Sequence, residues 1–255
     1  MPSADWQVCQ RPKISGPYAL ATGAALRISD LPMDHVPGLS PVVIALDGPA
    51  ASGKGTLARL ISDHYGFAHL DTGTLYRGVA WIVLSEGGAP ADAGRAAAAA
   101  REFAVQKIAN AEIRTKEVGA AASLVAANSG VRAALLDFQR RFALTPPKNA
   151  AGAVLDGRDI GTVVCPDATV KFFVTASPKT RAHRRWLELV PARPGLQEGD
   201  IYQDLLERDA RDAARDDAPM AAADDAELLD TTHLSIDAAF AAARRVIDGV
   251  FRRCG

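Results

Sequence analysis

The stretch VVIALDGPAASGKGT, residues 42–56, decides the fold of this chain. Its first five residues are apolar and mostly branched, which is typical of a strand buried on both faces in a parallel sheet. The glycines that follow let the backbone curl so that successive N–H groups point inward, and Lys54 adds a mobile positive charge. The apolar spacing of residues 56–64 predicts a helix whose N-terminus faces the same anion. The segment therefore predicts a phosphate-binding loop between a strand and a helix.

Gly48, Gly53 and Lys54 have the spacing of the P-loop. Gly55 stands where Ser or Thr usually holds magnesium directly, and Thr56 comes one position later. This Gly-Lys-Gly-Thr ending is typical of nucleoside monophosphate kinases, in which magnesium is held largely through waters. The alternative is a glycine-rich turn that binds nothing, which the preceding strand and the following helix disfavour.

Composition and charge exclude several classes of protein. The chain has 255 residues, of which 48% are apolar and 23% charged, as in an ordinary globular enzyme. A formal net charge of −1 gives no overall basic field for nucleic acid or anionic lipid. No apolar run approaches the roughly 20 residues of a membrane-spanning helix. We therefore expect a locally bound anion, with no nucleic-acid and no membrane partner.

The cysteines predict neither a disulfide framework nor a zinc site. Cys9, Cys165 and Cys254 lie far apart and show no Cys-x-x-Cys or Cys/His spacing. A reducing cytoplasm fits this pattern, so we expect a cytoplasmic protein. Residues 17–26 weakly resemble a signal peptide, but a nucleotide-binding core follows them, and export is rejected.

Strands and helices alternate along the chain. Apolar runs predict further strands at residues 153–155, 170–175 and 227–230. Periodic patterns predict helices over residues 75–85, 117–126, 131–142, 178–189, 201–215 and 236–251. This order predicts an α/β fold with a largely parallel sheet. In such sheets ligands bind beyond the carboxyl ends of the strands, where the P-loop lies.

Two segments interrupt this alternation. Residues 1–40 are rich in proline and lack periodicity, which predicts a poorly ordered extension before a domain over residues 41–255. Helical patterns over about residues 86–150 predict an insert that reaches over the site. Within it, the alanine-rich residues 89–104 predict a surface helix.

The segment DTGTLYR, residues 71–77, places an arginine one turn into a predicted helix. Arg77 would oppose the helix dipole unless an anion lay nearby. Thr72 or Thr74 could instead simply cap the helix, and taken alone the segment favours that interpretation.

The segment DGRDIG, residues 156–161, follows a buried-type strand, so its polar side chains should emerge beside the P-loop. Asp156 could order waters around magnesium, and Arg158 could grip a phosphate with its bidentate fork. An Asp-Gly turn that stabilises only itself is the alternative.

The segment ERDARDAARDD, residues 207–217, places Arg208, Asp212 and Arg215 on one face of a predicted helix. Alone, this pattern favours a solvated ladder of weak ion pairs. Two nucleotides in a closed cleft, however, would require several cationic partners, because buried charge must be paired.

A series of motifs in fixed order resembles the bacterial cytidylate kinases over about residues 42–250. The series is DGPAASGKGT, DTGTLYR, IRTKEV, VRAALL with QRRFA, DGRDIGTVVCPDA, RAHRRWLEL and ERDARDAARDDAP. The resemblance implies a P-loop kinase with a central parallel sheet covered by helices, a CMP-binding insert over about residues 86–150 and a short lid over about residues 178–200. It also implies a monomer that transfers the γ-phosphoryl group of ATP to CMP or dCMP with Mg²⁺ as cofactor.

The resemblance also implies roles for individual residues. The ATP phosphates would be bound by Gly48, Pro49, Ala50, Ala51, Ser52, Gly53, Lys54, Gly55 and Thr56. Magnesium would be held, largely through water, by Thr56 and Asp156. CMP would be bound by Thr72, Arg77, Ser123, Arg132, Arg158, Asp159, Arg208 and Asp212. The residues implied in catalysis are Lys54, Asp156, Arg158 and Arg215, with an unassigned arginine from residues 181–185.

The chain departs from the family pattern in three places. Residues 103–113 are shorter than in members that carry a small β-hairpin before the Ile-Arg-Thr segment. Residues 1–40 have no recognised counterpart. Ala51 replaces a frequent glycine, which alanine tolerates if its φ is negative.

The residues also suit phosphoryl transfer to a phosphate on chemical grounds. An acceptor phosphate, with its second pKa at about 6, is already ionised at neutral pH and needs no general base. Alignment and charge neutralisation suffice. A kinase acting on a hydroxyl group would need a carboxylate base, for which Asp71 or Asp159 could serve. A regulatory GTP- or ATP-binding switch is disfavoured because the chain lacks an Asn-Lys-x-Asp motif, and balanced charge disfavours nucleic-acid binding.

Overall fold

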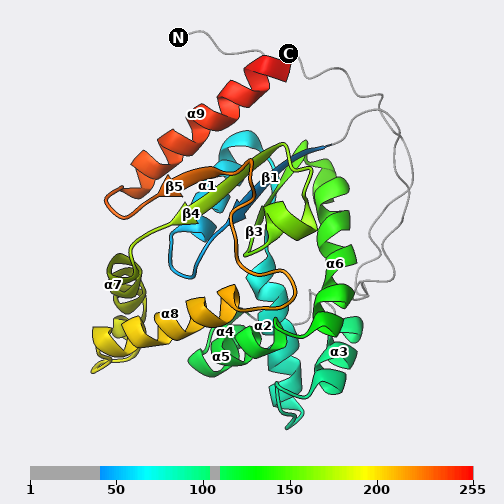
Figure 1. The fold of residues 1–255 in the computed structure, drawn as a ribbon, viewed down its shortest axis with the longest axis vertical. Helices are drawn as coiled ribbons and strands as arrows, with labels where there is room; N and C mark the ends of the chain where they lie inside the picture. Colours follow the sequence, from blue (N-terminus) through cyan, green and yellow to red (C-terminus); the bar gives the residue numbers. More distant parts are fainter. Residues whose placement is uncertain (1–40, 104–109, 255) are drawn as a thin grey trace.

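The computed structural model describes residues 41–103 and 110–254, which form a five-stranded, all-parallel sheet with helices on both faces (Figure 1). The strand order is β2-β3-β1-β4-β5. The strands are β1 (Val42–Asp47), β2 (Ala68–Asp71), β3 (Gly152–Asp156), β4 (Val170–Thr175) and β5 (Glu227–Asp230). The predicted α/β fold with a central parallel sheet is therefore confirmed.

The helices follow the predicted order. They are α1 (Lys54–Tyr65), α2 (Thr72–Ser85), α3 (Ala93–Glu102), α4 (Asn110–Ile113), α5 (Lys116–Val125), α6 (Ser129–Leu144), α7 (Pro178–Leu189), α8 (Glu198–Ala213) and α9 (Ile236–Cys254). The edge strand β2 was not predicted, because its four residues show no clear alternation. The predicted extension, residues 1–40, lies outside the described residues, as do residues 104–109 of the shortened stretch.

The central strand β1 explains why its sequence is continuously apolar. Val43 and Ala45 join a core formed with α2, α3, α5 and α6. Ile44 and Leu46 join a second core on the other face, formed with α1 and α9. Alternate side chains of a strand point to opposite faces, so a strand covered on both sides must be apolar throughout.

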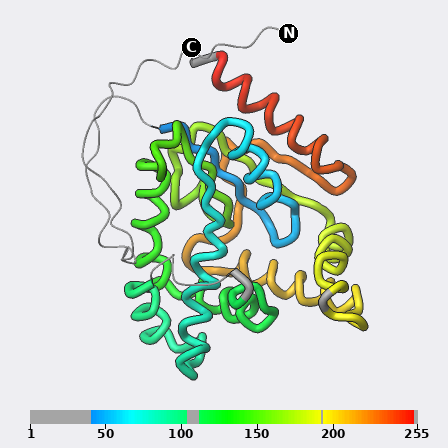
Figure 2. Tube along the Cα trace, turned by 180° about the vertical axis from the view of Figure 1, so that it is seen from behind, coloured from blue at the N-terminus to red at the C-terminus, as the bar shows by residue number. Residues whose placement is uncertain are grey.

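The segment between α2 and β3 is helical where the structure describes it. Figure 2 shows α2 running away from the sheet into the group formed by α3, α5 and α6. Asp92, Thr115 and Asn128 cap three of these helices by accepting hydrogen bonds from backbone N–H groups. The predicted alanine-rich surface helix is partly wrong. It begins at Ala93, and Ala96, Ala97, Ala99 and Ala100 are buried in the core.

A third, smaller core attaches α7 and α8 to the loop after β1. Ala50 of that loop packs with Ala182, Ile201 and Leu205. Figure 1 shows both helices facing the loop, beyond the carboxyl ends of β1 and β4. The segments that follow the strands are thus gathered at one end of the sheet.

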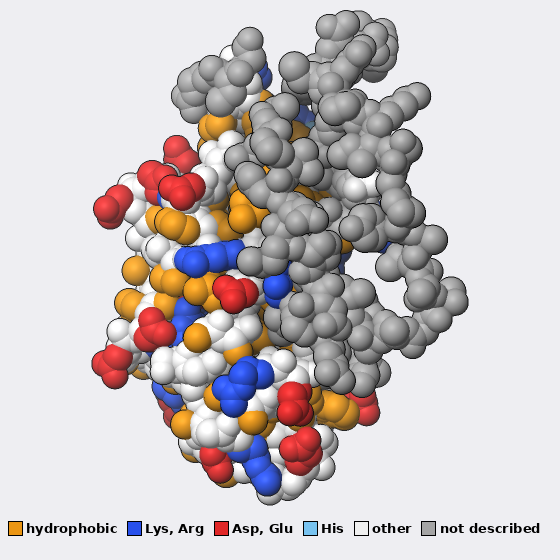
Figure 3. Space-filling model, turned by 90° about the vertical axis from the view of Figure 1, so that its right-hand side faces the viewer, with side chains coloured by type: hydrophobic (Ala, Val, Ile, Leu, Met, Phe, Trp, Pro, Cys, Tyr) orange, Lys and Arg blue, Asp and Glu red, His pale blue; other side chains and the backbone are white. Residues whose placement is uncertain are grey.

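The surface and helix lengths bear on possible partners. On the described part of the face in Figure 3, acidic and basic side chains are interspersed, without a patch of one sign. Across residues 41–103 and 110–254, no single helix combines the length and apolarity needed to cross a membrane; only residues 116–125 and 129–149, a pair bent by 97°, would qualify jointly by length and composition.

Candidate active site

The loop between β1 and α1 requires glycine at its first turn. Gly48 has φ of 137°, and a Cβ there would lie 2.0 Å from the backbone oxygen of Val174. Gly53, with φ of 89°, precedes α1 in the left-handed region. Ala51 has φ of 59°, so the condition for tolerating alanine, a negative φ, is not met. An alanine is therefore held in a conformation that costs L-residues about 1 kcal/mol or more.

Lys54 is the first residue of α1 and lies inside the loop. Its Nζ donates to the backbone oxygen of Pro49 at 3.2 Å, and the residue is 7% exposed. Burial, and next the charge of Arg158, lower the pKa of Lys54 to about 7. Asp156 and Asp71 act in the opposite direction. The lysine therefore shares one electrostatic environment with residues that follow β2 and β3.

The rest of the loop is held by backbone contacts. The oxygen of Ala50 accepts from Arg181 Nη1 at 3.2 Å, and the oxygen of Ser52 accepts from Thr231 Oγ1 at 2.9 Å. The buried Ser52 hydroxyl has no hydrogen-bond partner among the described residues. Thr56, one turn into α1, is exposed. The loop thus offers backbone N–H groups and hydroxyls on a fixed frame.

Asp156 ends β3 directly beside the loop. It pairs in register with Leu46 of β1 and Asp71 of β2, so three strands end together. Its Oδ2 lies 2.7 Å from Nε2 of His69. Thr72 does not cap α2 with its side chain; its hydroxyl donates to the backbone oxygen of Asp156 at 2.8 Å. The capping interpretation of this threonine is therefore wrong.

Asp212 is the centre of a buried cluster of charges. It is 1% exposed; Arg158 Nε lies 2.9 Å from its Oδ2 and Arg208 Nε 3.9 Å, and Arg215 bonds to its Oδ1. Burial opposes its ionisation, but the charges of Arg158, Arg215 and Arg208 outweigh burial and hold the pKa of Asp212 below its ordinary value. The solvated ladder is therefore wrong, and Arg215 lies beyond the end of α8.

The cluster carries more cationic than anionic charge. Burial, and next the charge of Arg158, lower the pKa of Arg208 to about 9. A partly buried group of guanidinium ions with one shared carboxylate can accept a further anion. The DGRDIG turn is accordingly more than a turn that stabilises itself, because Arg158 reaches α8.

A second buried ion pair lies between the insert and the turn after β3. Arg132 of α6 bonds to Asp159, and each side chain is only 7% exposed. Arg132 Nε also lies 3.5 Å from Asp217 Oδ2. The Ser123 hydroxyl of α5 is buried without a hydrogen-bond partner among the described residues. Buried polar atoms are normally paired, so this hydroxyl suits a ligand.

Arg77 and the predicted lid differ in how they are held. Arg77 Nη1 donates to the backbone oxygen of Ile113 at 3.2 Å. Arg181 is tied to Ala50 and to Asp209, and Arg184 donates to Thr231. Arg185 pairs with the exposed Glu188, and its charge, after burial, lowers the pKa of Arg77. Among these arginines, Arg185 is therefore the one whose charge acts on Arg77.

The donor set fits a magnesium ion that is held mainly by phosphates and water. Within residues 41–103 and 110–254 no three His, Cys, Asp or Glu side chains gather as metal ligands. Asp156 Oδ1 faces the start of α1, 3.9 Å from where a Cβ on Gly55 would lie. Mg²⁺ typically takes one or two carboxylates plus substrate phosphates. One carboxylate and the Thr56 hydroxyl meet that requirement.

Two residues near the site were not predicted. His69 was missed because β2 was not recognised as a strand. Asp47, at the end of β1, was included in the quoted segment without a role. Its carboxylate accepts from the backbone N–H groups of Ile160 and Gly161, each at 2.7 Å.

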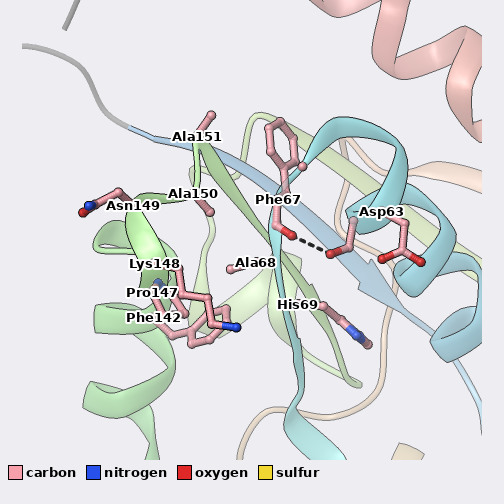
Figure 4. Close-up of a pocket in the computed structure, with 12 residues that line it drawn as sticks. Asp63, Phe67, Ala68, His69, Phe142, Pro147, Lys148, Asn149, Ala150 and Ala151 are labelled. Carbon is pink, nitrogen blue, oxygen red and sulfur yellow. Dashed lines mark hydrogen bonds between the residues drawn. The ribbon is translucent and has the colours of Figure 1, made fainter. Parts of the chain in front are cut away.

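A pocket of about 690 Å³ lies elsewhere, along the outer side of β2 (Figure 4). In Figure 4, Phe142, Pro147 and Lys148 lie on one side of this strand and His69 points to the other. Of the predicted site residues in the described chain, none lines this pocket. This pocket is therefore separate from the predicted site residues.

Comparison with known proteins agrees with this geometry. A family model described as cytidylate kinase matches residues 44–248. A cytidylate kinase of Xanthobacter autotrophicus is 53% identical over 214 residues, which cover 84% of this chain and 100% of that protein. One of Paramagnetospirillum magneticum is 54% identical over 205 residues, covering 80% and 97%. One of Rhodopseudomonas palustris (strain BisB18) is 50% identical over 209 residues, covering 82% and 97%.

Proposed function

The chain belongs to the cytidylate kinase family, and we propose on that premise that it transfers the γ-phosphoryl group of ATP to CMP or dCMP. The products are ADP and CDP or dCDP. The residue assignments rest chiefly on the proximity of the glycine-lined loop to the Asp212 cluster. Lys54 in the glycine-lined loop is electrostatically coupled to Arg158 and Arg208 of the Asp212 cluster.

On the donor side, residues 48–56 would bind the ATP phosphates. Their backbone N–H groups and the N-terminus of α1 favour anions. Lys54 would lie against the outer phosphates, where negative charge raises its pKa from about 7 and keeps it protonated. Thr56 and Asp156 would hold magnesium through water, and the ion would supply positive charge to this side of the site.

On the acceptor side, the cytosine would be read by Ser123, Arg132 and Asp159. Supporting this role, the Ser123 hydroxyl is buried without a partner among the described residues, and Arg132 and Asp159 are buried together. Arg208 and Asp212 would hold the sugar. Arg77 and Arg158 would clamp the CMP phosphate, with Thr72 fixing the end of β3 behind them.

Transfer then requires alignment and charge neutralisation. The CMP phosphate is ionised at neutral pH, so it attacks without a base. Arg215 and Arg158 would neutralise the moving phosphoryl group, whose charge is spread over three oxygens. We assign the lid arginine to Arg185. Arg181 and Arg184 are held by backbone and side-chain oxygens within the protein, whereas Arg185 pairs with the exposed carboxylate of Glu188 at the surface.

A hydroxyl acceptor is less well supported by the geometry. Asp159, one proposed base for that reaction, is occupied by its ion pair with Arg132. Asp71, the other, is exposed at the start of α2. Asp159 is therefore not free to contact a hydroxyl group, and Asp71 lies in solvent and not in a closed site.

We further propose the domain limits that the site requires. The CMP-binding insert spans about residues 86–150 and the lid about residues 178–200, within a kinase domain over residues 41–255. Since one chain supplies every proposed site residue, a monomer suffices. The nucleotide substrates are those of the cytoplasm, which is the proposed location.

The test is a comparison of phosphoryl acceptors with purified protein, ATP and Mg²⁺. We expect turnover with CMP and dCMP, and at least tenfold lower kcat/KM with UMP, because the wrong base leaves buried groups unpaired. Phosphorylation of no nucleoside monophosphate in the panel would contradict the proposed reaction and favour a hydroxyl acceptor.

A further inference from the structure

Asp47 occupies the junction between the two nucleotide sites. It is the last residue of β1, adjacent to Gly48 of the phosphate loop, and it is only 4% exposed. Both of its carboxylate oxygens accept backbone hydrogen bonds at 2.7 Å, Oδ1 from Ile160 and Oδ2 from Gly161. Asp47, which ends the strand before the phosphate loop, thus holds the turn that follows β3.

That segment is the turn that carries the acceptor-side residues. Ile160 and Gly161 follow Arg158 and Asp159 directly and begin the π-helical turn Ile160–Val164. The backbone oxygen of Asp159 accepts from Val163 and Val164 within the same turn. The start of the turn is fixed by Gly157, whose N–H donates to the oxygen of Leu46 at 2.9 Å. Asp159 therefore lies between two attachments to β1.

Burial of the Asp47 carboxylate is unfavourable in itself. Burial is the largest influence on Asp47 and raises its pKa to about 6, against the two backbone hydrogen bonds that lower it. Asp159 raises this pKa and Lys54 lowers it, while the aliphatic part of the Lys171 side chain lies beside Gly161 near the same carboxylate. A neutral side chain would avoid the penalty of burying a charge. The carboxylate, however, accepts two converging N–H groups at once.

We propose that Asp47 is a positioning residue for pyrimidine recognition. By accepting hydrogen bonds from the N–H groups of Ile160 and Gly161, it fixes the position of Asp159 relative to the phosphate loop. The inference rests on the proposed role of Asp159 in reading the base. Asp47 itself is not among the residues proposed to bind either nucleotide. It fixes the distance between the base-reading carboxylate and the donor loop by bonding both segments to one strand end.

The experiment measures base discrimination as the ratio of kcat/KM for CMP to that for UMP. In Asp47→Asn, one N–H group loses its acceptor and meets an amide donor, so we expect the ratio to fall about tenfold with KM for ATP within twofold of wild type. Asp159→Asn is measured in parallel and should lower the ratio by at least as much. In the double variant, the two effects should not multiply.

The outcomes separate the inference from the proposed function. A normal ratio in Asp47→Asn beside a lowered ratio in Asp159→Asn overturns the inference and leaves the proposed function intact. A normal ratio in Asp159→Asn refutes the base-reading role itself. Asp230→Asn is the matched control, because Asp230 also ends a strand and accepts a backbone N–H, from Thr232. This control should keep the wild-type ratio.

A second variant approaches the same contact from the turn. In Gly161→Ala the added Cβ would lie 3.4 Å from Asp47 Oδ2 and 3.1 Å from Lys171 Cδ, so these side chains or the turn must give by a few tenths of an ångström. We expect a fall of severalfold in the CMP-to-UMP ratio with an unchanged KM for ATP. This variant decides the question if Asp47→Asn does not fold, and an unchanged ratio overturns the inference.

Discussion

The donor loop and the acceptor cluster, which we propose bind the same kind of group, have opposite constructions. The loop is one contiguous segment, residues 48–56, and its donors are mainly backbone N–H groups supported by glycine conformations. The acceptor cluster is the set of proposed CMP-binding residues, which includes the arginines around Asp212. Its side chains come from α2, α5, α6, α8 and the turn after β3. The first depends on local backbone geometry and the second on tertiary packing.

The two regions also balance their charge differently. Lys54 is the single cation of the donor loop segment, and its pKa is lowered to about 7. In the acceptor cluster three arginines surround Asp212. Removing a charge should therefore impair the loop in function and the cluster in both function and stability.

The largest expected effect is on catalysis. Lys54→Ala and Arg158→Ala should each lower kcat by on the order of 10³ or more, because each removes positive charge from the path of the transferring group. Steady-state kinetics with ATP and CMP measure the loss, and circular dichroism checks that the fold is retained. Activity within tenfold of wild type would refute the assigned role of the residue concerned.

The next effect is on stability and separates a buried from an exposed carboxylate of α8. Asp212→Ala should lower the free energy of unfolding by about 3 kcal/mol, because it leaves buried arginines without their shared partner. Asp204→Ala is the control, since its ion pair with Lys116 is half exposed and should contribute at most about 1 kcal/mol. Urea unfolding measures both. Equal losses of unfolding free energy in the two variants would contradict the stabilising role of Asp212 in the cluster.

The pH dependence of stability tests the carboxylate that joins the two regions. The pKa of Asp47 is raised from 3.8 to about 6, so its stabilising contribution is fully present below pH 3.8 and is lost as the pH rises through 6. At 1.36 kcal/mol per pKa unit, the loss is about 3 kcal/mol. About 1 kcal/mol of this is already lost at pH 4.5, so relative to Asp47→Asn wild type should lose about 2 kcal/mol between pH 4.5 and 7.5. A parallel pH dependence of the two proteins would contradict the raised pKa.

The smallest effect concerns backbone strain in the donor loop. Ala51→Gly should raise the free energy of unfolding by about 0.5–1 kcal/mol, because glycine adopts φ of 59° without the cost to an L-residue. Part of the gain is offset by the greater freedom of glycine in the unfolded chain. Thermal unfolding measures the change, and destabilisation would show that the alanine methyl group contributes more by packing.

The same difference explains what could be predicted from the sequence. The donor loop, its strand and its helix were predicted from one segment, because their chemistry is local. Strands β4 and β5 were predicted at their observed bounds. The edge strand β2 was missed, and with it the contact between His69 and Asp156.

The acceptor cluster was accessible to sequence reasoning chiefly through resemblance. Spacing alone favoured a solvated ladder for Arg208, Asp212 and Arg215, because nothing local indicates that Arg158 reaches Asp212 at 2.9 Å. Asp47 was overlooked for the same reason, since its partners lie more than 110 residues away. A carboxylate directly before the glycine loop, after an apolar strand, was the signal available.

The most direct test of the division into two sites is calorimetric titration of two variants with each nucleotide separately. We expect Lys54→Ala to weaken MgATP binding at least tenfold and to bind CMP within threefold of wild type, and Arg158→Ala to show the reverse pattern. If either variant loses affinity for both nucleotides equally while remaining folded, a local donor loop and a dispersed acceptor cluster are not separate sites.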